Sequence, residues 1–241
     1  MMKPSISFSI IVPLLNEEGN IEQLIQSLSA IIAHENAESN EDKSTIEIIM
    51  VDGGSLDTTV ALLNKLESCQ IISTEVGRAK QMNEGAKKAK NDVLVFLHAD
   101  TILPVNALSL LRDNFWLSDK KWGRFDVYIK GEHLLFRVIE YMINQRSKLS
   151  GICTGDQAIF VKKQTFDDLS GYASIPLMED IDLSKRLKKF SSPYCFREKV
   201  ITSNRRWAQR GIIRTILSMW QLRFLFFIGV SPNKLHKKYY G

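Results

Sequence analysis

The stretch Val93-Leu94-Val95-Phe96-Leu97-His98-Ala99-Asp100 joins five apolar residues to a short polar turn that carries one carboxylate. An unbroken apolar run of strand length is typical of a strand buried on both faces, as in parallel sheets covered by helices. Ligands of such sheets bind just beyond the carboxyl ends of the strands. Asp100 is therefore expected beside a bound ligand. Residues 46–51 form a similar run of strand length, which is followed by the carboxylate of Asp52.

Apolar runs alternate with helical periodicity throughout the first hundred residues. We expect strands over residues 7–12, 46–51, 69–73 and 93–97, with Pro13 ending the first, and helices over residues 20–33, 56–66 and 77–90. This order predicts an α/β fold with a mostly parallel central sheet and helices on both faces. Residues 34–44 are polar and acidic, which indicates a surface loop.

The second half of the chain is less regular. Helices are expected over residues 105–115 and 132–149, and a further helix follows from residues 177–182 and runs through residue 190. Strands are expected over residues 122–129 and 194–200, and residues 154–161 turn into another strand. The sequence shows no internal repeat and no clear linker, so we assign residues 1–208 to one domain. Residues 209–241 are expected to form a C-terminal amphipathic helical extension.

The 241 residues carry a formal net charge of +5, with an isoelectric point near 9.0. A basic chain favours an anionic partner such as nucleotide phosphates, nucleic acid or a membrane surface, although ordinary solubility charge gives the same number. Neither the GxGxxG nor the P-loop pattern follows any strand, so bound phosphates would need a metal at Asp100 or side chains such as Arg78. Patterns of common nucleic-acid-binding modules are absent, which argues against a nucleic-acid partner.

The three cysteines, Cys69, Cys153 and Cys195, are widely spaced and odd in number. They indicate neither a zinc site nor a disulfide framework. Reduced thiols fit the cytoplasm, and the N-terminal residues lack the pattern of a signal peptide. We therefore expect a cytoplasmic protein.

Several motifs, taken together and in order, resemble those of glycosyltransferase family 2, the nucleotide-sugar transferases with the GT-A fold. They are Ile11-Val12-Pro13 with Asn16-Glu17-Glu18, Val51-Asp52-Gly53-Gly54-Ser55 with Asp57, Phe96-Leu97-His98-Ala99-Asp100, Met178-Glu179-Asp180 and Arg205-Arg206-Trp207. Three further motifs, which begin at Gly77, Trp122 and Thr154, resemble a bacterial subgroup named for its association with radical-SAM or selenium-related genes. The resemblance covers about residues 8–208.

The resemblance implies an inverting enzyme that moves a sugar from a nucleotide-diphosphate-sugar donor to a hydroxyl acceptor, with a divalent metal, Mn²⁺ or Mg²⁺. It implies a nucleotide-binding first half and an acceptor-binding second half. Asp180 is implied as catalytic base beside Glu179, and Asp100 as metal ligand, with His98 as a further candidate that suits Mn²⁺ better than Mg²⁺. The implied donor-binding residues are Pro13, Leu15, Asn16, Glu17, Asp52, Gly53, Ser55, Arg78, Asn83, His98, Ala99 and Asp100. The implied acceptor-side residues are Gly155, Asp156, Arg206 and Trp207.

Each implied role has a structural alternative. Asp52 can cap the turn that follows it, Glu179 and Asp180 can favour a helix N-terminus, and Trp207 can be a core residue. His98, where the motif has Asp, leaves open a second function, a sugar-nucleotide-binding protein without catalysis. At an ordinary pKa near 4, Asp180 would be ionised at pH 7 and able to accept a proton.

Residues 212–230 form the most hydrophobic stretch of the chain, with a polar helical stripe of Arg210, Arg214, Ser218 and Gln221. A membrane-spanning helix tolerates central charges poorly, so an amphipathic helix in the membrane interface fits better. The lysines that follow favour anionic lipid. We expect a peripheral contact of residues 210–238 with the inner membrane face, and a helix packed on protein remains an equal alternative.

Overall fold

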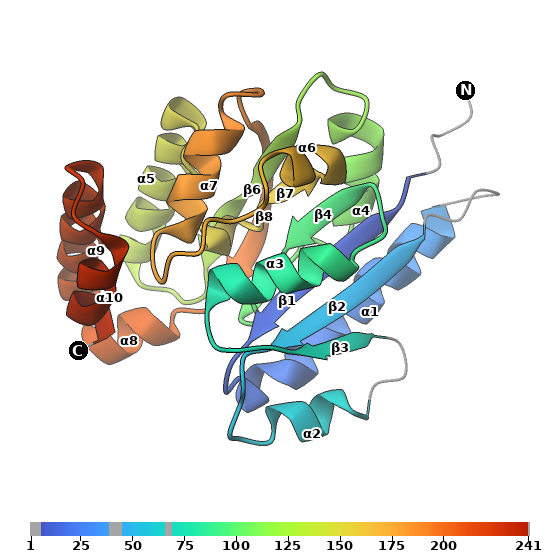
Figure 1. The fold of residues 1–241 in the computed structure, drawn as a ribbon, viewed down its shortest axis with the longest axis horizontal. Coiled ribbons are helices and arrows are strands. Elements are labelled where there is room, and N and C mark those ends of the chain that lie inside the picture. Colours follow the sequence, from blue (N-terminus) through green and yellow to red (C-terminus); the bar gives the residue numbers. More distant parts are fainter. Residues whose placement is uncertain (1–5, 39–44, 66–68, 241) are drawn as a thin grey trace.

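The computed structural model of the chain describes residues 6–38, 45–65 and 69–240. Its strands form one eight-stranded sheet in the order β3-β2-β1-β4-β7-β6-β8-β5 (Figure 1). The strands are β1 (Phe8–Leu14), β2 (Ile46–Asp52), β3 (Gln70–Ser73), β4 (Val93–Phe96), β5 (Thr101–Ile102), β6 (Trp122–Ile129), β7 (Phe160–Lys162) and β8 (Tyr194–Thr202).

The sheet has a parallel half and a mixed half. β1 pairs in parallel with β2 and β4, and β2 pairs in parallel with β3. β7 runs antiparallel to both β4 and β6, while β8 runs parallel to β6 and antiparallel to β5. The expected class, α/β with a mostly parallel sheet, is confirmed. The parallel half brings the carboxyl ends of β1, β2 and β4 to one edge, where the first three family motifs begin.

Helices cover both faces of the sheet (Figure 1). They are α1 (Glu18–Glu38), α2 (Thr59–Leu63), α3 (Arg78–Lys88), α4 (Ala107–Leu110), the π-helical η1 (Leu111–Phe115), α5 (Leu134–Ser150), the 3₁₀ turn η2 (Gly155–Gln157), α6 (Lys163–Asp168), α7 (Glu179–Leu187), α8 (Arg205–Arg210), α9 (Ile212–Phe227) and α10 (Pro232–Tyr240).

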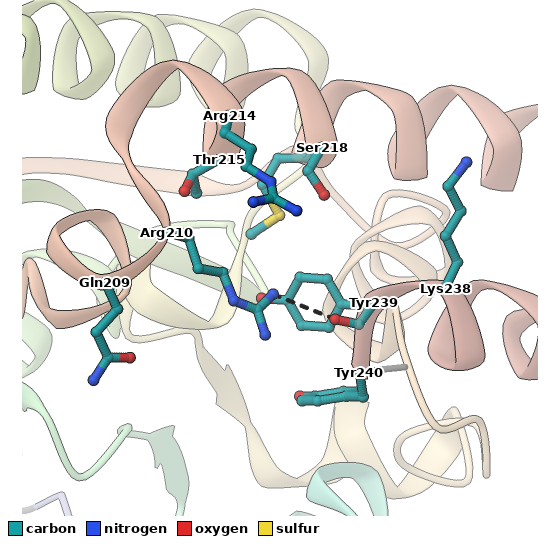
Figure 2. A pocket seen from close by; sticks show the side chains of 9 residues that line it. Gln209, Arg210, Arg214, Thr215, Ser218, Lys238, Tyr239 and Tyr240 are labelled. Carbon is teal, nitrogen blue, oxygen red and sulfur yellow. Dashed lines mark hydrogen bonds between the residues drawn. The ribbon is translucent and has the colours of Figure 1, made fainter.

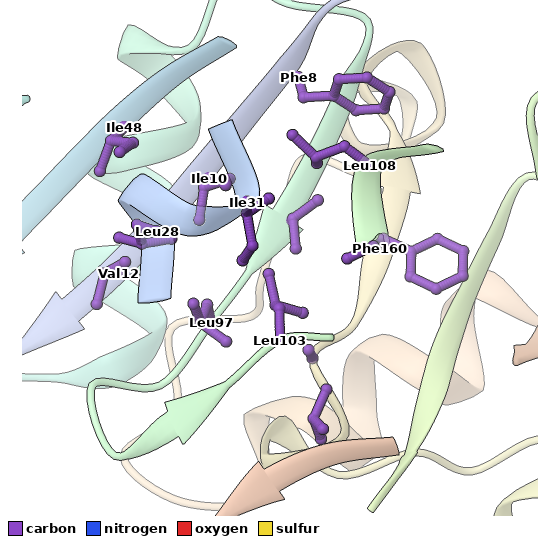
Figure 3. Close-up of a cluster of buried hydrophobic side chains, with 14 of the residues drawn as sticks. Phe8, Ile10, Val12, Leu28, Ile31, Ile48, Leu97, Leu103, Leu108 and Phe160 are labelled. Atoms are coloured by element: carbon purple, nitrogen blue, oxygen red, sulfur yellow. The ribbon is translucent and has the colours of Figure 1, made fainter. Parts of the chain in front are cut away.

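Two apolar clusters hold the helices to the sheet. On one face, Leu28 and Ile31 of α1 pack on Ile10 of β1, as Figure 3 shows. On the other face, Met82 of α3 and Leu183 of α7 join the second cluster. Each such side chain contributes about 1.5–3 kcal/mol when it is fully buried. The functional motifs therefore stand on strand and helix ends that the core fixes.

The first strand continues through Pro13 to Leu14, so the expected end at Pro13 is wrong. Pairing with β4 stops at Ile11, whose carbonyl accepts from the Leu97 amide. The backbone nitrogen of Pro13 points to the same side of β1 as the backbone of Ile11, which is the side of β4. β4 no longer pairs with β1 at this position. The missing N–H of Pro13 costs no ladder hydrogen bond there.

The first helix extends to Glu38, five residues beyond the expected end at residue 33. Glu35 is buried, and its carboxylate accepts from the equally buried Arg112 of η1 and from Ser109. This ion pair buries Glu35 within a stretch that otherwise stays at the surface, and the helix continues through it. The expected surface loop from residue 34 is therefore wrong as far as Glu38, and its residues 39–44 lie outside the described part.

The C-terminal residues form three helices rather than one continuous stripe. Gly211, with φ +79°, separates α8 from α9, so Arg210 lies on a different helix from Arg214. One face of α9 packs on the domain through Ile216, while Leu222 joins a separate cluster with α10. Another face leaves large apolar side chains exposed: Ile213, Leu217, Trp220, Phe224, Phe227 and Ile228. Within the described ranges, every helix is too short or too polar to cross a bilayer.

Candidate functional site

The carboxyl ends of β1 and β2 are fastened together from the α3 side. The Gln81 side-chain amide donates to the carbonyls of Leu14 (2.7 Å) and Val51 (2.8 Å). The Gly53 amide donates to the same Leu14 carbonyl at 2.9 Å. Gln81 is buried and belongs to the motif that begins at Gly77, but sequence reasoning gave it no role, because that role depends on two strands that meet only in the fold.

The loops after β1 and β2 hold several expected donor-binding residues against each other. The Asn16 amide donates to Ser55 Oγ, and the Leu56 amide donates to Asn16 Oδ1, both at 2.8 Å. Glu17 lies in the same loop and donates its amide to Thr59 Oγ1 at 2.9 Å. Pro13 is buried, whereas Leu15 is exposed.

Asp52 closes the second of these loops on itself. Its carboxylate accepts from the amide of Gly54 (2.9 Å), the amide of Ser55 (3.1 Å) and the Ser55 hydroxyl (2.5 Å). Gly53 packs against the side chain of Gln81. These contacts agree with the alternative role of Asp52 as a cap of the turn that follows it. A contact between Asp52 and a nucleoside would be additional to them.

Asn83 makes a structural link of a similar kind. Its amide nitrogen donates to the Tyr172 carbonyl at 2.9 Å, and its amide oxygen accepts from the Tyr172 amide at 2.8 Å. This pair of bonds joins α3 to the loop before α7. The expected donor-binding residue thus positions the segment that carries Glu179 and Asp180.

Arg78, at the start of α3, lies among expected site carboxylates. Burial lowers the pKa of its guanidinium, but nearby groups raise that pKa by more. In decreasing order of effect, these groups are Glu179, Tyr240, Asp100 and Asp180. The fold therefore gathers four of the expected site residues, which we name the charged cluster: Arg78, Asp100, Glu179 and Asp180. Neighbouring atoms surround the guanidinium closely enough to lower its pKa, yet the residue keeps a solvent-exposed surface.

Asp180 is held in one orientation at the start of α7. Its Oδ2 accepts from the Gly155 amide at 3.0 Å, and its Oδ1 accepts from the Ile181 amide at 2.7 Å. Burial, followed by the charge of Glu179, raises the pKa of Asp180 to about 7, although both hydrogen bonds lower it. The expectation of an ordinary pKa near 4 is wrong, and Asp180 titrates near neutral pH.

The residue before this pair, Met178, has φ +69°. A non-glycine residue in this region costs about 1–3 kcal/mol and is held there by its surroundings. Met178 is itself buried in the cluster that includes Leu222 and Leu235 of the C-terminal helices.

His98 meets the acceptor-side segment directly. A Cβ added to Gly155 would overlap the imidazole Nε2 of His98, so this position requires a residue without a side chain. Gly155 is also the donor to Asp180, which connects His98 to the proposed base through one residue. Ala99 is buried between His98 and Asp100, and Asp156 lies in η2 beside Gly155.

Two further residues of this region were missed by sequence reasoning. Arg146 of α5 has a pKa lowered by burial and raised in part by Asp156 and Asp180, and its buried Nε and Nη2 lack hydrogen-bond partners among the described atoms. Burial, then Asp180 and Glu179, raise the pKa of Tyr172 well above its usual value. Neither residue belongs to a recognisable motif, so no sequence signal marks them.

The Asp100 carboxylate is little engaged in hydrogen bonds with the described residues. It accepts one long hydrogen bond from the Thr101 hydroxyl, at 3.5 Å. Within the described residues, no three His, Cys, Asp or Glu side chains converge to hold a metal by themselves. Asp100 therefore fits a cation that completes its shell with substrate phosphates and water, as Mg²⁺ does in phosphate-binding sites.

The remaining acceptor-side motif lies at α8. Arg205 pairs with Glu17 at 3.3 Å, which joins the first loop of the chain to the start of the C-terminal helices. Trp207 packs beside Phe136 in an apolar cluster, in agreement with its core alternative. The side chain of Arg206 lies outside the described part of the chain.

A family comparison matches most of the sheet. The sequence profile described as "Glycosyl transferase family 2" matches residues 9–168. The match includes the motifs around Asp52 and Asp100 and ends before Glu179.

Curated relatives agree with this match. The poly-beta-1,6-N-acetyl-D-glucosamine synthase of Staphylococcus aureus (strain MSSA476) is 28% identical over 189 residues, which cover 71% of this chain and 43% of the relative. The poly(ribitol-phosphate) beta-N-acetylglucosaminyltransferase TarS of S. aureus (strain Mu50 / ATCC 700699) is 29% identical over 101 residues, which cover 39% of this chain and 16% of TarS. The chain spans less than half the length of these relatives.

Solved structures resemble the fold. The mannosyltransferase PcManGT from Pyrobaculum calidifontis, in complex with GDP-Man and Mn²⁺, has a TM-score of 0.62 at 19% identity and covers 91% of this chain and 61% of its own. S. aureus TarS 1-349 in complex with UDP has a TM-score of 0.61 at 16% identity, and the match covers 82% of this chain and 60% of the TarS chain. At these identities the likeness concerns the fold alone.

Proposed function

Because the chain belongs to glycosyl transferase family 2, we propose that it transfers a sugar from a nucleotide-diphosphate-sugar donor to an acceptor hydroxyl, with inversion at the anomeric carbon. The observation that carries this proposal is Asp180, a carboxylate of fixed orientation and near-neutral pKa beside Arg78. A sugar-binding protein without catalysis has no need of such a base.

Asp180 is proposed to take the proton of the acceptor hydroxyl while the hydroxyl oxygen bonds to the anomeric carbon. A base of this kind contributes about 10²–10⁴-fold to the rate. Glu179 is proposed to tune Asp180, since its charge raises the Asp180 pKa. Attack on the face opposite the leaving group inverts the anomeric centre.

Negative charge grows on the diphosphate as the bond to the sugar breaks. Arg78 is proposed to stabilise this charge, because the residue is exposed and its neighbours raise the pKa of its guanidinium. Asp100, with His98 beside it in the chain, would hold the divalent ion. That ion, when bound, supplies further positive charge to the diphosphate oxygens.

The joined loops after β1 and β2 are proposed to receive the nucleoside. Both loops follow carboxyl strand ends in the parallel half of the sheet, where ligands of such folds bind. Asn16 and Ser55 already contact each other there, so a nucleoside would meet a prearranged surface.

The exposed apolar side chains of α9 support a peripheral membrane contact at the inner face. Phe227 and Ile213 are 78% and 66% exposed, and lysines follow on α10. An apolar face next to basic residues favours the interface of an anionic bilayer. Residues 209–241 are accordingly proposed as an extension of the catalytic domain.

The experiment that tests this function is a thermal-shift series with UDP, GDP and their sugar conjugates, with and without Mn²⁺. A ligand that binds only the native state raises its melting temperature. Asp100→Ala is expected to remove the Mn²⁺-dependent part of the shift and to leave the melting temperature without ligand unchanged. A mutant shift equal to that of the wild type would rule out Asp100 as metal ligand, and no shift with any nucleotide would reject the function itself.

A further inference from the structure

A basic pocket of about 400 Å³ lies between α8, α9 and α10 (Figure 2). Its cations are Arg210, Arg214 and Lys238, one from each helix. No acidic side chain contributes to its lining. The volume is within the range of small-molecule sites, about 300–1,000 Å³.

Arg210 is fixed inside this basic pocket. Its Nη1 donates to the Tyr239 carbonyl at 3.3 Å, and its guanidinium carbon lies 5.2 Å from the centre of the Tyr239 ring. Figure 2 shows the Arg214 guanidinium, from α9, facing the same space. No Asp or Glu side chain in the described ranges forms an ion pair with any of the three cations. Their charge is therefore available to an anion, and guanidinium groups suit phosphate oxygens.

A second, shallow and open pocket, lined by residues of α9 alone, adjoins the first. It shares Arg214 and Ser218 with the basic pocket and adds Ile213, Leu217 and Gln221. Ile213 and Leu217 belong to the exposed apolar face of α9. A ligand in both pockets would place its anionic group on the cations and an aliphatic chain along α9.

The other side of the basic pocket leads to the charged cluster. Tyr239 lines the pocket and packs in one apolar cluster with Met178 and Ile181, the residues on either side of Glu179 and Asp180 in the chain. A ligand held by the three cations would therefore extend on this side toward Arg78 and its neighbour Asp180.

We propose that the two pockets bind the acceptor, and that the acceptor is an amphiphilic phosphate ester with a hydroxyl-bearing head and an aliphatic tail. This assignment rests on the proposed function. The phosphate would lie among Arg210, Arg214 and Lys238, the tail along Ile213 and Leu217, and the head toward Asp180. In the reaction the hydroxyl proton passes to Asp180, the hydroxyl oxygen bonds to the anomeric carbon, and the nucleoside diphosphate leaves with the bonding electrons. The phosphate of the acceptor is unchanged.

The test measures binding of decyl phosphate, below its micelle concentration, to the full chain by calorimetry. Arg214→Gln and Lys238→Gln each remove a hydrogen bond to a charged group, so each is expected to weaken binding by about tenfold or more. Arg223→Gln on α9 and Lys237→Gln on α10 are the matched controls, since they remove the same charge outside the pocket and are expected to change binding less than twofold. An equal loss in pocket variants and controls would overturn the proposal, because general surface charge would then account for binding.

Inorganic phosphate distinguishes a lipid from a free anion. It is expected to bind at least about tenfold more weakly than decyl phosphate, because it lacks the tail that covers Leu217. Leu217→Gln is expected to weaken decyl phosphate and to leave inorganic phosphate unchanged. Equal affinity for both ligands would overturn the amphiphilic assignment.

Nucleotide binding to the same variants separates this proposal from the proposed function. Arg214→Gln and Lys238→Gln are expected to keep the UDP or GDP thermal shift of the wild type. Selective decyl phosphate binding without any nucleotide shift would reject the glycosyltransferase function and, with it, the acceptor role of the pocket. A nucleotide shift without selective decyl phosphate binding would reject the pocket assignment alone.

Discussion

Asp180 combines two properties that a base toward a sugar alcohol needs, a fixed orientation and a proton affinity suited to neutral pH. The first comes from the amides of Gly155 and Ile181, and the second from burial beside Glu179. General bases work best when their pKa lies near the operating pH. The role of Asp180 can therefore be tested in two independent ways, by the rate of sugar transfer and by the pH dependence of the melting temperature.

Replacing Asp180 by Asn keeps the size of the side chain and removes the basic oxygen. We expect kcat to fall by about 10²-fold or more, with donor affinity nearly unchanged. Glu179→Gln should be milder, because Glu179 acts through Asp180. In the wild type, kcat/KM should rise with pH and level off above an apparent pKa near 7. Transfer by the Asn variant at the wild-type rate would move the search for the base to Asp156.

The same carboxyl group should leave a mark on stability. Its folded-state pKa, about 7, lies above its value of 3.8 in the absence of perturbation, so between these two values the folded state binds more protons than the unfolded state. Stability that is present below about pH 4 is therefore lost as pH rises to about 7. Asp180→Asn cannot titrate, so its melting temperature minus that of the wild type should be larger at pH 8 than at pH 5. A difference that is constant with pH would contradict the raised pKa.

Sequence motifs identified the residues that meet in the charged cluster, but not what surrounds them. Arg78, Asp100 and Asp180 lie in recognisable motifs, and both carboxylates lie near enough to Arg78 to raise its pKa. Arg146 and Tyr172 carry no such mark, because their importance arises from side chains that approach from separate elements. The pKa of Asp180 was missed for the same reason, since burial is a property of the assembled fold.

At the scale of elements, the buried pair of Glu35 and Arg112 joins the end of α1 to η1. The two side chains are 1% and 2% exposed. Arg112→Leu would leave the Glu35 charge buried without its cation, at a cost of about 3–5 kcal/mol in the free energy of unfolding. Urea unfolding measures this loss.

Two companion variants make the Arg112 experiment specific. The double variant Glu35→Leu with Arg112→Leu should recover most of the loss, because it removes both charges. Lys163→Met breaks the more exposed pair with Asp167 and should cost less than about 1 kcal/mol. A double variant as unstable as Arg112→Leu would assign the loss to packing instead.

Periodicity placed most helices and strands within a few residues of their positions, and β6 at its full length. The misses have causes in tertiary contacts. Pro13 stays within β1 because its neighbour strand has ended, and α1 outlasts its apolar pattern because Glu35 has a buried cation. Both causes lie in contacts between elements, which a pattern along one segment does not contain.

At the scale of the whole molecule, the outer face of α9 predicts binding to anionic vesicles at low salt. Burying a phenylalanine contributes about 1.5–3 kcal/mol, so Phe224→Gln or Phe227→Gln should weaken co-sedimentation with phosphatidylglycerol vesicles by about tenfold. Leu56→Gln is the control, since Leu56 is 95% exposed outside α9. If the wild type ignores such vesicles, the face serves another contact.

The order of the strands was beyond sequence reasoning, although the class of the fold was not. Alternating strands and helices predict the parallel half, because a helix that connects two parallel strands of one sheet almost always makes a right-handed crossover. The insertion of β7 between β4 and β6 depends on pairings between distant segments, such as Val95 with Phe160. Those pairings are what bring Gly155 beside His98.

The cluster that buries Met178 with Leu222 and Leu235 has a thermodynamic consequence. A ligand that shifts α9 and α10 must repack the residue next to the acid pair, since these side chains share one interior. Linkage then requires reciprocity: the factor by which a vesicle changes donor affinity equals the factor by which the donor changes vesicle affinity. Four dissociation constants give this factor: those of the donor with and without vesicles, and those of the vesicles with and without donor. Met178→Ala removes the side chain that links the two sites and should bring the factor toward one.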